Sequence, residues 1–408
     1  MSASSPHIVL LDLYHRGHHL SYIQMLCRYW ADTALAGKLT VLVSEPFLEN
    51  HSKAIDEFRH VDSIQWKTLS ASASASGGNI GLKGMIQANS AHKVALQEAV
   101  SLNPSHIVCL FWDHAQLAIA SLNRVLRANN IEVSGIFFRP DLHHAASGFS
   151  SIVRRWRKMV MLKRALRAGQ LQKVFCLNPL AVDSINALNK AEKAVFLPDG
   201  IDIQPSSVSR YDFRKDHQLE DHQLAILLFG SLSARKGVFK VLGALDQLTE
   251  TQRLKLVLII AGKTGTGEKE AIDQAISASK QSIRIIYEPG YVPDAHMTTL
   301  FEGSDVALVA YQKHTGSSGI LLRAAAAGIP VIGSDFGLVG HNIRSNKLGM
   351  DVDTTSEHAL AHAFSKVLDG EMPAFDLAFD ALRAADFAAL NTPLTFAQTI
   401  FSTAHGSD

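Results

Sequence analysis

Short runs of apolar residues alternate with helix-length segments along the whole chain. The first run, His7–Leu13, ends at the polar loop Tyr14–His19, and a helical pattern follows over Leu20–Trp30. Further runs occupy Leu39–Ser44, His106–Phe111, Val133–Phe138, Lys173–Leu177 and Ala194–Leu197. Continuous apolar strands separated by helices are typical of a mostly parallel sheet that is covered on both faces. The first half of the chain is therefore predicted to be an α/β domain.

The same pattern starts again in the second half. Strand candidates are Ala225–Phe229, Leu254–Ile260, Ile283–Tyr287, Val306–Val309 and Pro330–Ile332. The polar stretch Gln204–His222 separates the two halves and is the best linker candidate. We expect two Rossmann-like, doubly wound parallel-sheet domains that face a cleft, over residues 1–200 and 201–384. A C-terminal helix within about 385–408 is expected to cross back to the first domain. In such sheets ligands bind beyond the carboxyl ends of the strands.

Composition and charge narrow the class of protein. A chain of 408 residues is too long for one core, and 47% hydrophobic with 19% charged residues is typical of a folded protein. The net charge of +1 gives no field that would recruit nucleic acid. Cys27, Cys109 and Cys176 lack metal-site spacing, so we expect reduced thiols, no metal and a cytoplasmic location. Neither a signal peptide nor a membrane-spanning run is predicted.

A glycine-rich loop follows the strand candidate AILLF in the second half. It reads GSLSARKG over residues 230–237, with Gly230 at the end of the strand and Lys236 near a helix start. Glycine lets the backbone approach a ligand closely, and amide groups, a helix dipole and an ammonium group together suit a diphosphate. An ordinary turn with a solvated Arg–Lys pair explains the same residues, and both interpretations remain open.

A second loop, HTGSSGI over residues 314–320, runs into the helix candidate LLRAAAAG. Two glycines and two serines before a helix offer several N–H and hydroxyl donors to an anion. Close packing explains the alanines, and Gly328 with Pro330 ends the helix. Packing explains the GSSG run less well, because small residues contribute little to a core. The loop therefore predicts a second set of anion-binding groups.

Taken in chain order, these loops and the segments between them resemble the sequence of a known family. GSLSARKG, LVLIIAGK, GYVPDAHMTTLFEGSDVALV and GSSGILLRAAAAGIPVIGSD resemble the second domain of family 4 retaining glycosyltransferases, which have the GT-B fold, over about Ala225–Asp353. VFCLNPLAVDSIN with FLPDGID resembles the stretch that closes the first domain, and the N-terminal third fits in outline. The resemblance implies a hexosyltransferase-like enzyme that retains anomeric configuration and needs neither metal nor cofactor. Its donor would be a UDP- or GDP-linked nucleotide sugar, and its acceptor a glycan or lipid-linked molecule of polysaccharide biosynthesis.

The resemblance also assigns roles at the donor site. Lys236 matches the lysine that holds the donor diphosphate, whereas Ser231 stands where the family usually has an arginine. Thr315 and Arg323 stand where two glutamates contact the sugar and the ribose. Tyr291 in GYVP is either a base-stacking residue or a turn aromatic. The donor-site candidates are Gly230, Ser231, Lys236, Tyr291, Gly316, Ser317, Ser318, Gly319, Ile320 and Arg323.

An arginine in place of a glutamate changes the chemistry, because arginine only donates hydrogen bonds and is permanently cationic. Three interpretations of Arg323 are open: it binds a phosphate or a carboxylated donor sugar, it forms a structural ion pair, or donor turnover has been lost. We favour an active enzyme with altered donor recognition. The alternatives are a catalytically inactive binding or partner protein of the same fold, and a sugar-nucleotide epimerase.

Three loops rich in ionisable side chains follow strand candidates of the first half: residues 14–19, 111–114 and 139–144. Histidines and carboxylates there suit hydrogen bonding to sugar hydroxyls and proton transfer. A cap or a solvated residue explains any single histidine better, but three such loops together favour a site. The acceptor-binding candidates are Gly17, His18, His19, Asp113 and His114. The catalytic candidates, besides Lys236, are Arg139, Asp141 and His143, where the family commonly has a histidine or an aspartate.

Residues 151–167 (SIVRRWRKMVMLKRALR) combine seven basic side chains with interleaved apolar ones. A basic amphipathic helix can lie on an anionic membrane, which would place the protein peripherally at the inner membrane face. A solvated helix whose apolar residues pack on the first domain explains the same pattern.

Overall fold

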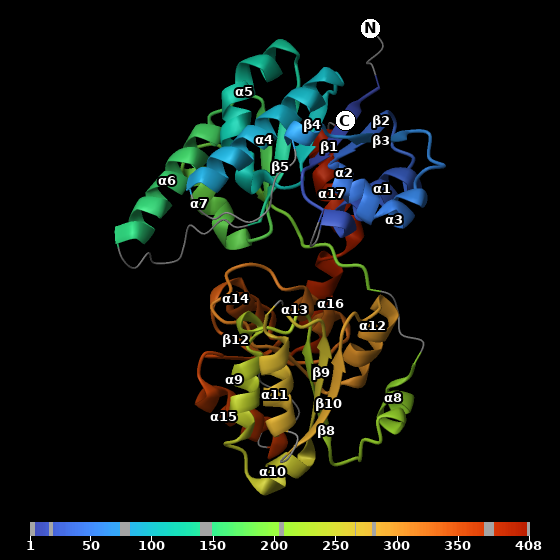
Figure 1. The fold of residues 1–408 in the computed structure, drawn as a ribbon, viewed down its shortest axis with the longest axis vertical. Coiled ribbons are helices and arrows are strands. Elements are labelled where there is room, and N and C mark those ends of the chain that lie inside the picture. Colours follow the sequence, from blue (N-terminus) through green and yellow to red (C-terminus); the bar gives the residue numbers. More distant parts are fainter. Residues whose placement is uncertain are drawn as a thin grey trace. The chain divides into compact units, whose positions relative to one another are not determined.

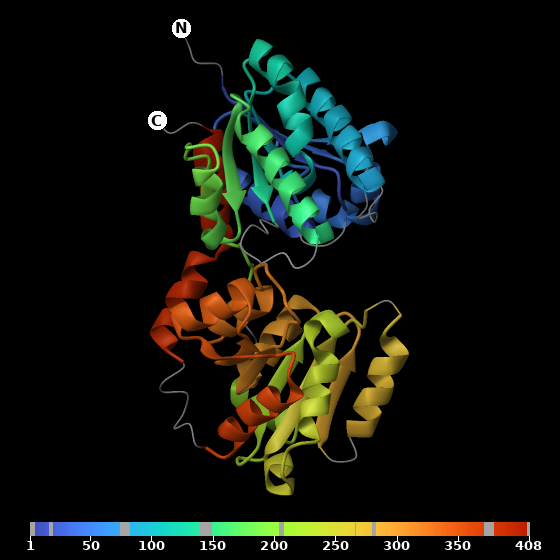
Figure 2. The ribbon, with the colours of Figure 1, turned by 90° about the vertical axis from the view of Figure 1, so that its left-hand side faces the viewer.

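The chain forms two compact units in the computed structural model, Met1–Gly200 with Pro393–Asp408, and Ile201–Thr392 (Figure 1). The structure describes residues 5–15, 19–73, 82–138, 149–203, 208–265, 267–279, 283–370 and 379–405. Each unit contains one parallel sheet with helices on both faces (Figures 1 and 2). The predicted α/β class with two doubly wound sheets is therefore confirmed.

The sheet of the first unit has the strand order β3-β2-β1-β4-β5-β6-β7. Its strands are β1 (His7–Asp12), β2 (Lys38–Val43), β3 (Ile64–Thr68), β4 (His106–Cys109), β5 (Glu132–Phe137), β6 (Leu171–Cys176) and β7 (Ala194–Phe196). The helices α1 (His19–Asp32), α2 (Glu45–Asn50), α3 (Ser52–Asp56) and α17 (Pro393–Ala404) lie on one face. The helices α4 (Leu82–Ser101), α5 (Gln116–Ala128), α6 (Phe149–Leu166) and α7 (Val182–Ala187) lie on the other.

Alternation along β1 shows why this sheet needs two helical layers. Val9 and Leu11 pack with the α4–α7 layer, whereas Ile8 and Leu10 pack with the α1–α3 layer, and all are buried. The helix α17 completes the second layer beside α1, as Figure 1 shows in red and blue. The chain returns to the first unit at Pro393, within the expected range of about 385–408.

The sheet of the second unit has the order β10-β9-β8-β11-β12-β13, with all its strands parallel. Its strands are β8 (Leu224–Phe229), β9 (Leu256–Gly262), β10 (Arg284–Pro289), β11 (Val306–Val309), β12 (Val331–Ser334) and β13 (Gly349–Val352). One face packs against α9 (Val238–Leu245), α11 (Lys269–Ser279) and α15 (Glu357–Leu368). The other packs against α8 (Arg210–Asp216), α12 (Asp294–Gly303), α13 (Gly319–Ala326), α14 (Gly337–Asn346) and α16 (Ala381–Leu390), and α10 (Glu250–Lys255) precedes β9.

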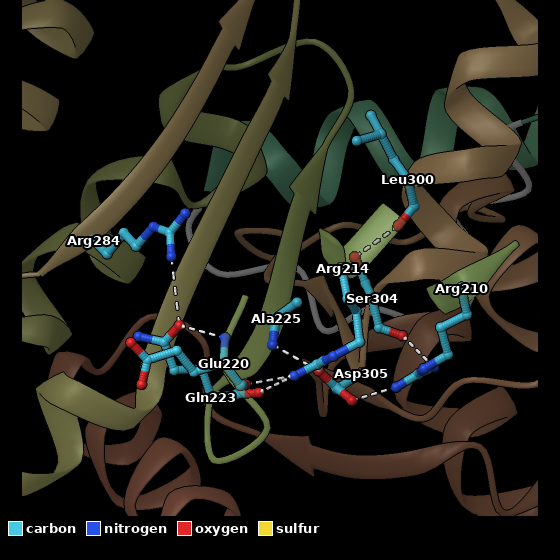
Figure 3. A network of polar contacts seen from close by, with 9 residues as sticks. All are labelled: Arg210, Arg214, Glu220, Gln223, Ala225, Arg284, Leu300, Ser304 and Asp305. Carbon is cyan, nitrogen blue, oxygen red and sulfur yellow. Dashed lines mark hydrogen bonds and ion pairs between the residues drawn. The ribbon is translucent and has the colours of Figure 1, made fainter. Parts of the chain in front are cut away.

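The stretch expected to be a linker contains α8, so that expectation is wrong for its described part. Phe213 of α8 is 1% exposed and packs in the core with α12. Polar contacts hold the helix against the start of the sheet (Figure 3). The Asp305 carboxylate accepts hydrogen bonds from the Ala225 amide at 2.7 Å and from Arg214 at 3.3 Å, and Arg210 donates to the Ser304 carbonyl at 3.1 Å.

Two strands, β3 and β13, have no counterpart among the predicted strands. Both lie at sheet edges, where one face of the strand reaches solvent and a continuous apolar run is not required. The small, polar segment 70–79, expected as a surface loop, is described only as far as Ala73, where a short 3-10 helix (Ala71–Ala73) packs against α4.

Candidate donor and acceptor sites

The donor-site loops of the second unit meet where its strand order reverses. This point lies between β8 and β11, and in open α/β sheets ligands bind beyond the carboxyl ends of the strands at such a point. The loop after β8 forms a short 3-10 helix, η4 (Ala234–Lys236), and then enters α9 at Gly237. Gly237 has a φ of 79°, and a Cβ there would collide with the carbonyl oxygen of Ala310 after β11. Glycine therefore lets the two loops approach each other.

Lys236 reaches across this point to the loop after β11. Its Nζ donates to the Tyr311 hydroxyl at 2.5 Å and lies 4.0 Å from the centre of the Tyr311 ring. The Ser318 hydroxyl donates to the same phenol oxygen at 2.9 Å. Tyr311 is 3% exposed, and burial raises its pKa to about 12, so it is a neutral phenol. One aromatic residue thus joins the two predicted anion-binding loops.

The charge of Lys236 depends on its surroundings. Desolvation by burial, with a smaller effect of the positive charge on Arg235, lowers the pKa of Lys236 to about 7. A negatively charged group beside the lysine would favour its ammonium form and raise this pKa again. The arrangement is therefore suited to binding an anion.

The GSSG loop leads directly into the first turn of α13. Ser318 caps this helix, because its side chain accepts a hydrogen bond from the Leu321 amide at 3.2 Å. The Ser317 carbonyl accepts one from His314 Nε2 at 3.1 Å, which holds the loop closed. A Cβ on Gly230 would lie 3.6 Å from Lys236 Nζ and 3.8 Å from Ile320 Cδ1. The structure therefore brings Gly230, Lys236, Ser318 and Ile320 together, with Gly316, Ser317 and Gly319 in the same loop.

Three further donor-site candidates differ in their surroundings. Ser231 is exposed beside the β8 loop. Tyr291 is 72% exposed, and Lys263 Nζ lies 5.2 Å from the centre of its ring. Arg323 Nη2 donates to the backbone carbonyl of Asp202 at 3.3 Å within the same unit. Burial lowers the pKa of Arg323, and the carboxylates of Asp294 and Asp202 oppose that effect. This packing is consistent with the interpretation of Arg323 as a structural residue.

The strand order of the first unit reverses between β1 and β4, and acceptor-site candidates gather there. His19 Nδ1 lies 2.6 Å from the carboxylate of Asp12, which is 1% exposed at the end of β1. His114 Nδ1 lies 2.6 Å from the Tyr14 hydroxyl. The Asp113 carboxylate accepts a hydrogen bond from the Phe138 amide at 2.9 Å, so it links the end of β4 to the end of β5.

Two buried residues near these sites, His92 in the first unit and Tyr311 in the second, were not among the candidates predicted from the sequence. His92 of α4 lies against Tyr14 and His114, and burial lowers its pKa to about 4, so it is a neutral imidazole. The sequence alone gives no indication that this histidine, which lies within a predicted helical segment, is close to the other candidate residues. Tyr311 had a usable signal, because it follows the predicted strand Val306–Val309 after one intervening residue.

Several predicted residues lie outside the described part of the chain. They are the acceptor-binding candidates Gly17 and His18 and the catalytic candidates Arg139, Asp141 and His143. Within the described ranges, no cluster of three or more His, Cys, Asp or Glu side chains could hold a metal ion. Each helix in those ranges is too short or too polar to cross a bilayer.

The basic segment forms α6, which packs through Leu162, Ala165 and Leu166. Val153, Trp156 and Val160 point outward, with 47%, 68% and 43% exposure. Their spacing of three and four residues places them on one side of the helix. The described basic side chains Lys158, Lys163 and Arg164 are also exposed.

Part of the second unit is similar to a known protein family. Residues 209–379 match the family model described as glycosyl transferases group 1. Over 145 residues the chain is 30% identical to glycogen synthase of Mycobacterium tuberculosis, a match that covers 35% of this chain and 34% of that protein. The chain thus spans about a third of the length of this curated relative.

Solved structures resemble the chain over nearly its whole length. Anabaena HepE in complex with UDP and glucose has a TM-score of 0.63 at 15% identity, covering 98% of this chain and 99% of that chain. Sucrose-phosphate synthase from Thermosynechococcus elongatus has a TM-score of 0.67 at 15% identity, covering 97% of both chains. WaaG, a glycosyltransferase involved in lipopolysaccharide biosynthesis, has a TM-score of 0.64 at 16% identity, covering 98% of this chain and 100% of that chain. At such identities the likeness establishes the fold alone. The chain therefore has the GT-B fold, and residues 209–379 of its second unit are similar to the group 1 glycosyl transferases.

Proposed function

We propose that this protein is a glycosyltransferase that takes a hexose from a UDP- or GDP-linked donor bound by its second unit. The observation that carries the proposal is that Tyr311 links Lys236 to Ser318 of the GSSG loop at the point where the strand order reverses. Both loops lie within the family match. UDP-glucose is the donor class best supported, because HepE was solved in complex with UDP-glucose and with UDP and glucose.

In the proposed reaction, the leaving diphosphate lies against Lys236 and the amino-terminal end of α13. Preorganised positive potential at a leaving group is a large source of catalysis, because it needs no reorganisation during the reaction. Lys236 and the helix dipole supply this potential without a divalent ion. Retention of anomeric configuration follows from the family resemblance.

The acceptor, a glycan or a lipid-linked molecule, is proposed to bind the first unit. His19, Asp113 and His114 lie at the carboxyl ends of its strands, together with Gly17 and His18 in sequence. Arg139, Asp141 and His143, which follow β5 in the sequence, are the proposed catalytic residues of this unit. A glycan or lipid-linked acceptor is proposed partly because WaaG, a structure of similar fold, is a glycosyltransferase involved in lipopolysaccharide biosynthesis.

Donor recognition is proposed to differ from that of the family pattern. Arg323 donates to the Asp202 carbonyl and lies near two carboxylates. Because a guanidinium group has no acceptor atom, Arg323 cannot accept hydrogen bonds from a ribose as a glutamate does. Other groups must therefore hold the ribose. Thr315 offers a neutral hydroxyl to the sugar in place of a carboxylate.

Donor turnover with a panel of nucleotide sugars tests the proposal. Replacing Lys236 with Ala should lower turnover about a hundredfold, because one preorganised group that stabilises the leaving charge is lost. Lys240→Ala is the matched control, since Lys240 lies on α9 and pairs with Glu357 at 2.9 Å. The control should keep the wild-type rate.

Three outcomes would count against this function. If no donor is turned over and Lys236→Ala leaves nucleotide affinity unchanged, the protein is a binding or partner protein. If the donor is isomerised without any acceptor, the protein is an epimerase. Equal losses in the Lys236 and Lys240 variants would show that Lys236 has no special role.

A further inference from the structure

Tyr311 is the residue on which the two donor loops of the second unit converge. Its phenol oxygen accepts hydrogen bonds from Lys236 at 2.5 Å and from Ser318 at 2.9 Å. No resemblance assigned a role to this position, and the candidate donor residues did not include it. Its own position is tightly fixed, since it is 3% exposed.

The backbone around Tyr311 is held from both sides. The Thr354 hydroxyl donates to the Tyr311 carbonyl at 2.8 Å. The Gln312 amide donates to the Arg235 carbonyl in the β8 loop at 2.9 Å, and the Gln312 side chain donates to the carbonyls of Ala310 and Thr354. The phenol group of Tyr311 is therefore held in one position. The Lys236 side chain that donates to it is flexible, since it has four rotatable bonds.

We propose that Tyr311 is a positioning residue for the donor diphosphate, which fixes the Lys236 ammonium and the first turn of α13 in one arrangement before the nucleotide binds. Without the phenol oxygen, Lys236 loses its hydrogen-bond acceptor and Ser318 loses one of its contacts. Ordering Lys236 and Ser318 would then cost free energy when the nucleotide binds, which would weaken its affinity. This inference rests on the proposed function, because it assumes that the second unit binds a nucleoside diphosphate.

Replacing Tyr311 with Phe tests the inference, because the ring stays under Lys236 and only the hydroxyl is removed. Calorimetry with UDP and with GDP should show affinity about tenfold weaker, as expected for the loss of a charge-assisted hydrogen bond. Tyr287→Phe is the matched control, since the Tyr287 hydroxyl donates to Asp273 at 2.8 Å in the same unit, away from the two loops. The control should bind as the wild type does.

The pH profile of binding separates positioning from a purely structural role. Charged and titratable groups around Lys236 are Arg235 on η4, Tyr311 itself, and His314, whose ring packs on Tyr311. Loss of the Tyr311 oxygen as a hydrogen-bond acceptor destabilises the ammonium form of Lys236. The midpoint of the pH profile should therefore move to lower pH in Tyr311→Phe. In a Lys236→Ala background the same change should have little further effect on affinity.

A second variant removes the other contact of the phenol oxygen. Ser318→Ala should also weaken UDP binding. Its control is Ser356→Ala, since Ser356 caps α15 through the same kind of bond to the Ala359 amide at 3.2 Å. The control should lower only the melting temperature.

The outcomes distinguish this inference from the proposed function. If the wild type binds UDP or GDP and Lys236→Ala abolishes binding, but Tyr311→Phe and Ser318→Ala match their controls, the inference is overturned and the function stands. The inference is also overturned if the Tyr311 and Lys236 effects simply add. If the wild type binds neither nucleotide, the proposed function itself has failed.

Discussion

At the scale of single residues, Lys236 and its neighbour Arg235 illustrate two kinds of positive charge. Arg235 is exposed to solvent. Lys236 is half-buried against Tyr311, and its pKa is lowered to about 7. An anion that binds beside Lys236 favours its charged form, so anion binding and protonation of this lysine are linked.

This linkage predicts the pH dependence of nucleotide binding. Below pH 7 the lysine of the free protein is already charged, so binding needs no proton uptake there. Above pH 7 the free lysine is neutral and must take up a proton, so the affinity for UDP should fall by up to about tenfold per pH unit. Calorimetry between about pH 6.5 and 9 measures this slope. A flat profile in the wild type, or the same slope in Lys236→Ala, would contradict it.

At the scale of elements, the sequence predicted every strand inside the two described sheets, but of their four edge strands it missed β3 and β13. Val306–Val309 is β11 as expected, because all its side chains are buried. The edge strand Ile64–Thr68 was missed, since most of its side chains reach solvent. The contact of Lys236 with Tyr311, 75 positions apart, could not be foreseen. This contact depends on the pairing of β8 with β11, which cannot be predicted from a single sequence.

The helix α6 yields a prediction at this scale. Its exposed Val153, Trp156 and Val160 lie on a helix rich in basic side chains, so we expect it to contact an anionic membrane surface. Each basic side chain near such a surface contributes about 1 kcal/mol, so reversing the charges of Lys163 and Arg164 to Glu should lower binding at least about tenfold. Cosedimentation with vesicles of phosphatidylglycerol and phosphatidylcholine measures the change.

Two comparisons make this membrane test decisive. Trp156→Ala should weaken vesicle binding, whereas Tyr211→Ala, which removes an exposed aromatic residue of α8 in the second unit, should not. Equal binding to purely zwitterionic vesicles, or no effect of the charge reversal, would leave α6 as a solvated helix that only packs on the first unit.

At the scale of the whole molecule, the C-terminal helix α17 ties the end of the chain to the first unit. Phe396 is fully buried, and its ring lies 4.6 Å from that of Tyr22 on α1. The two units can be followed separately during unfolding, because all four tryptophans, Trp30, Trp66, Trp112 and Trp156, belong to the first unit. Tryptophan fluorescence therefore reports on the first unit alone.

Phe396→Ala should lower the free energy of unfolding of the first unit by about 3–5 kcal/mol, because it leaves a cavity between α17 and α1. Urea unfolding followed by tryptophan fluorescence measures this loss. Leu394→Ala, on the same helix but at a side chain that is 53% exposed, should change it by no more than about 0.5 kcal/mol. Equal effects of the two substitutions would mean that α17 does not contribute to the core of the first unit. A large effect of Phe396→Ala alone would show that the last helix of the chain stabilises the unit that contains its first strand.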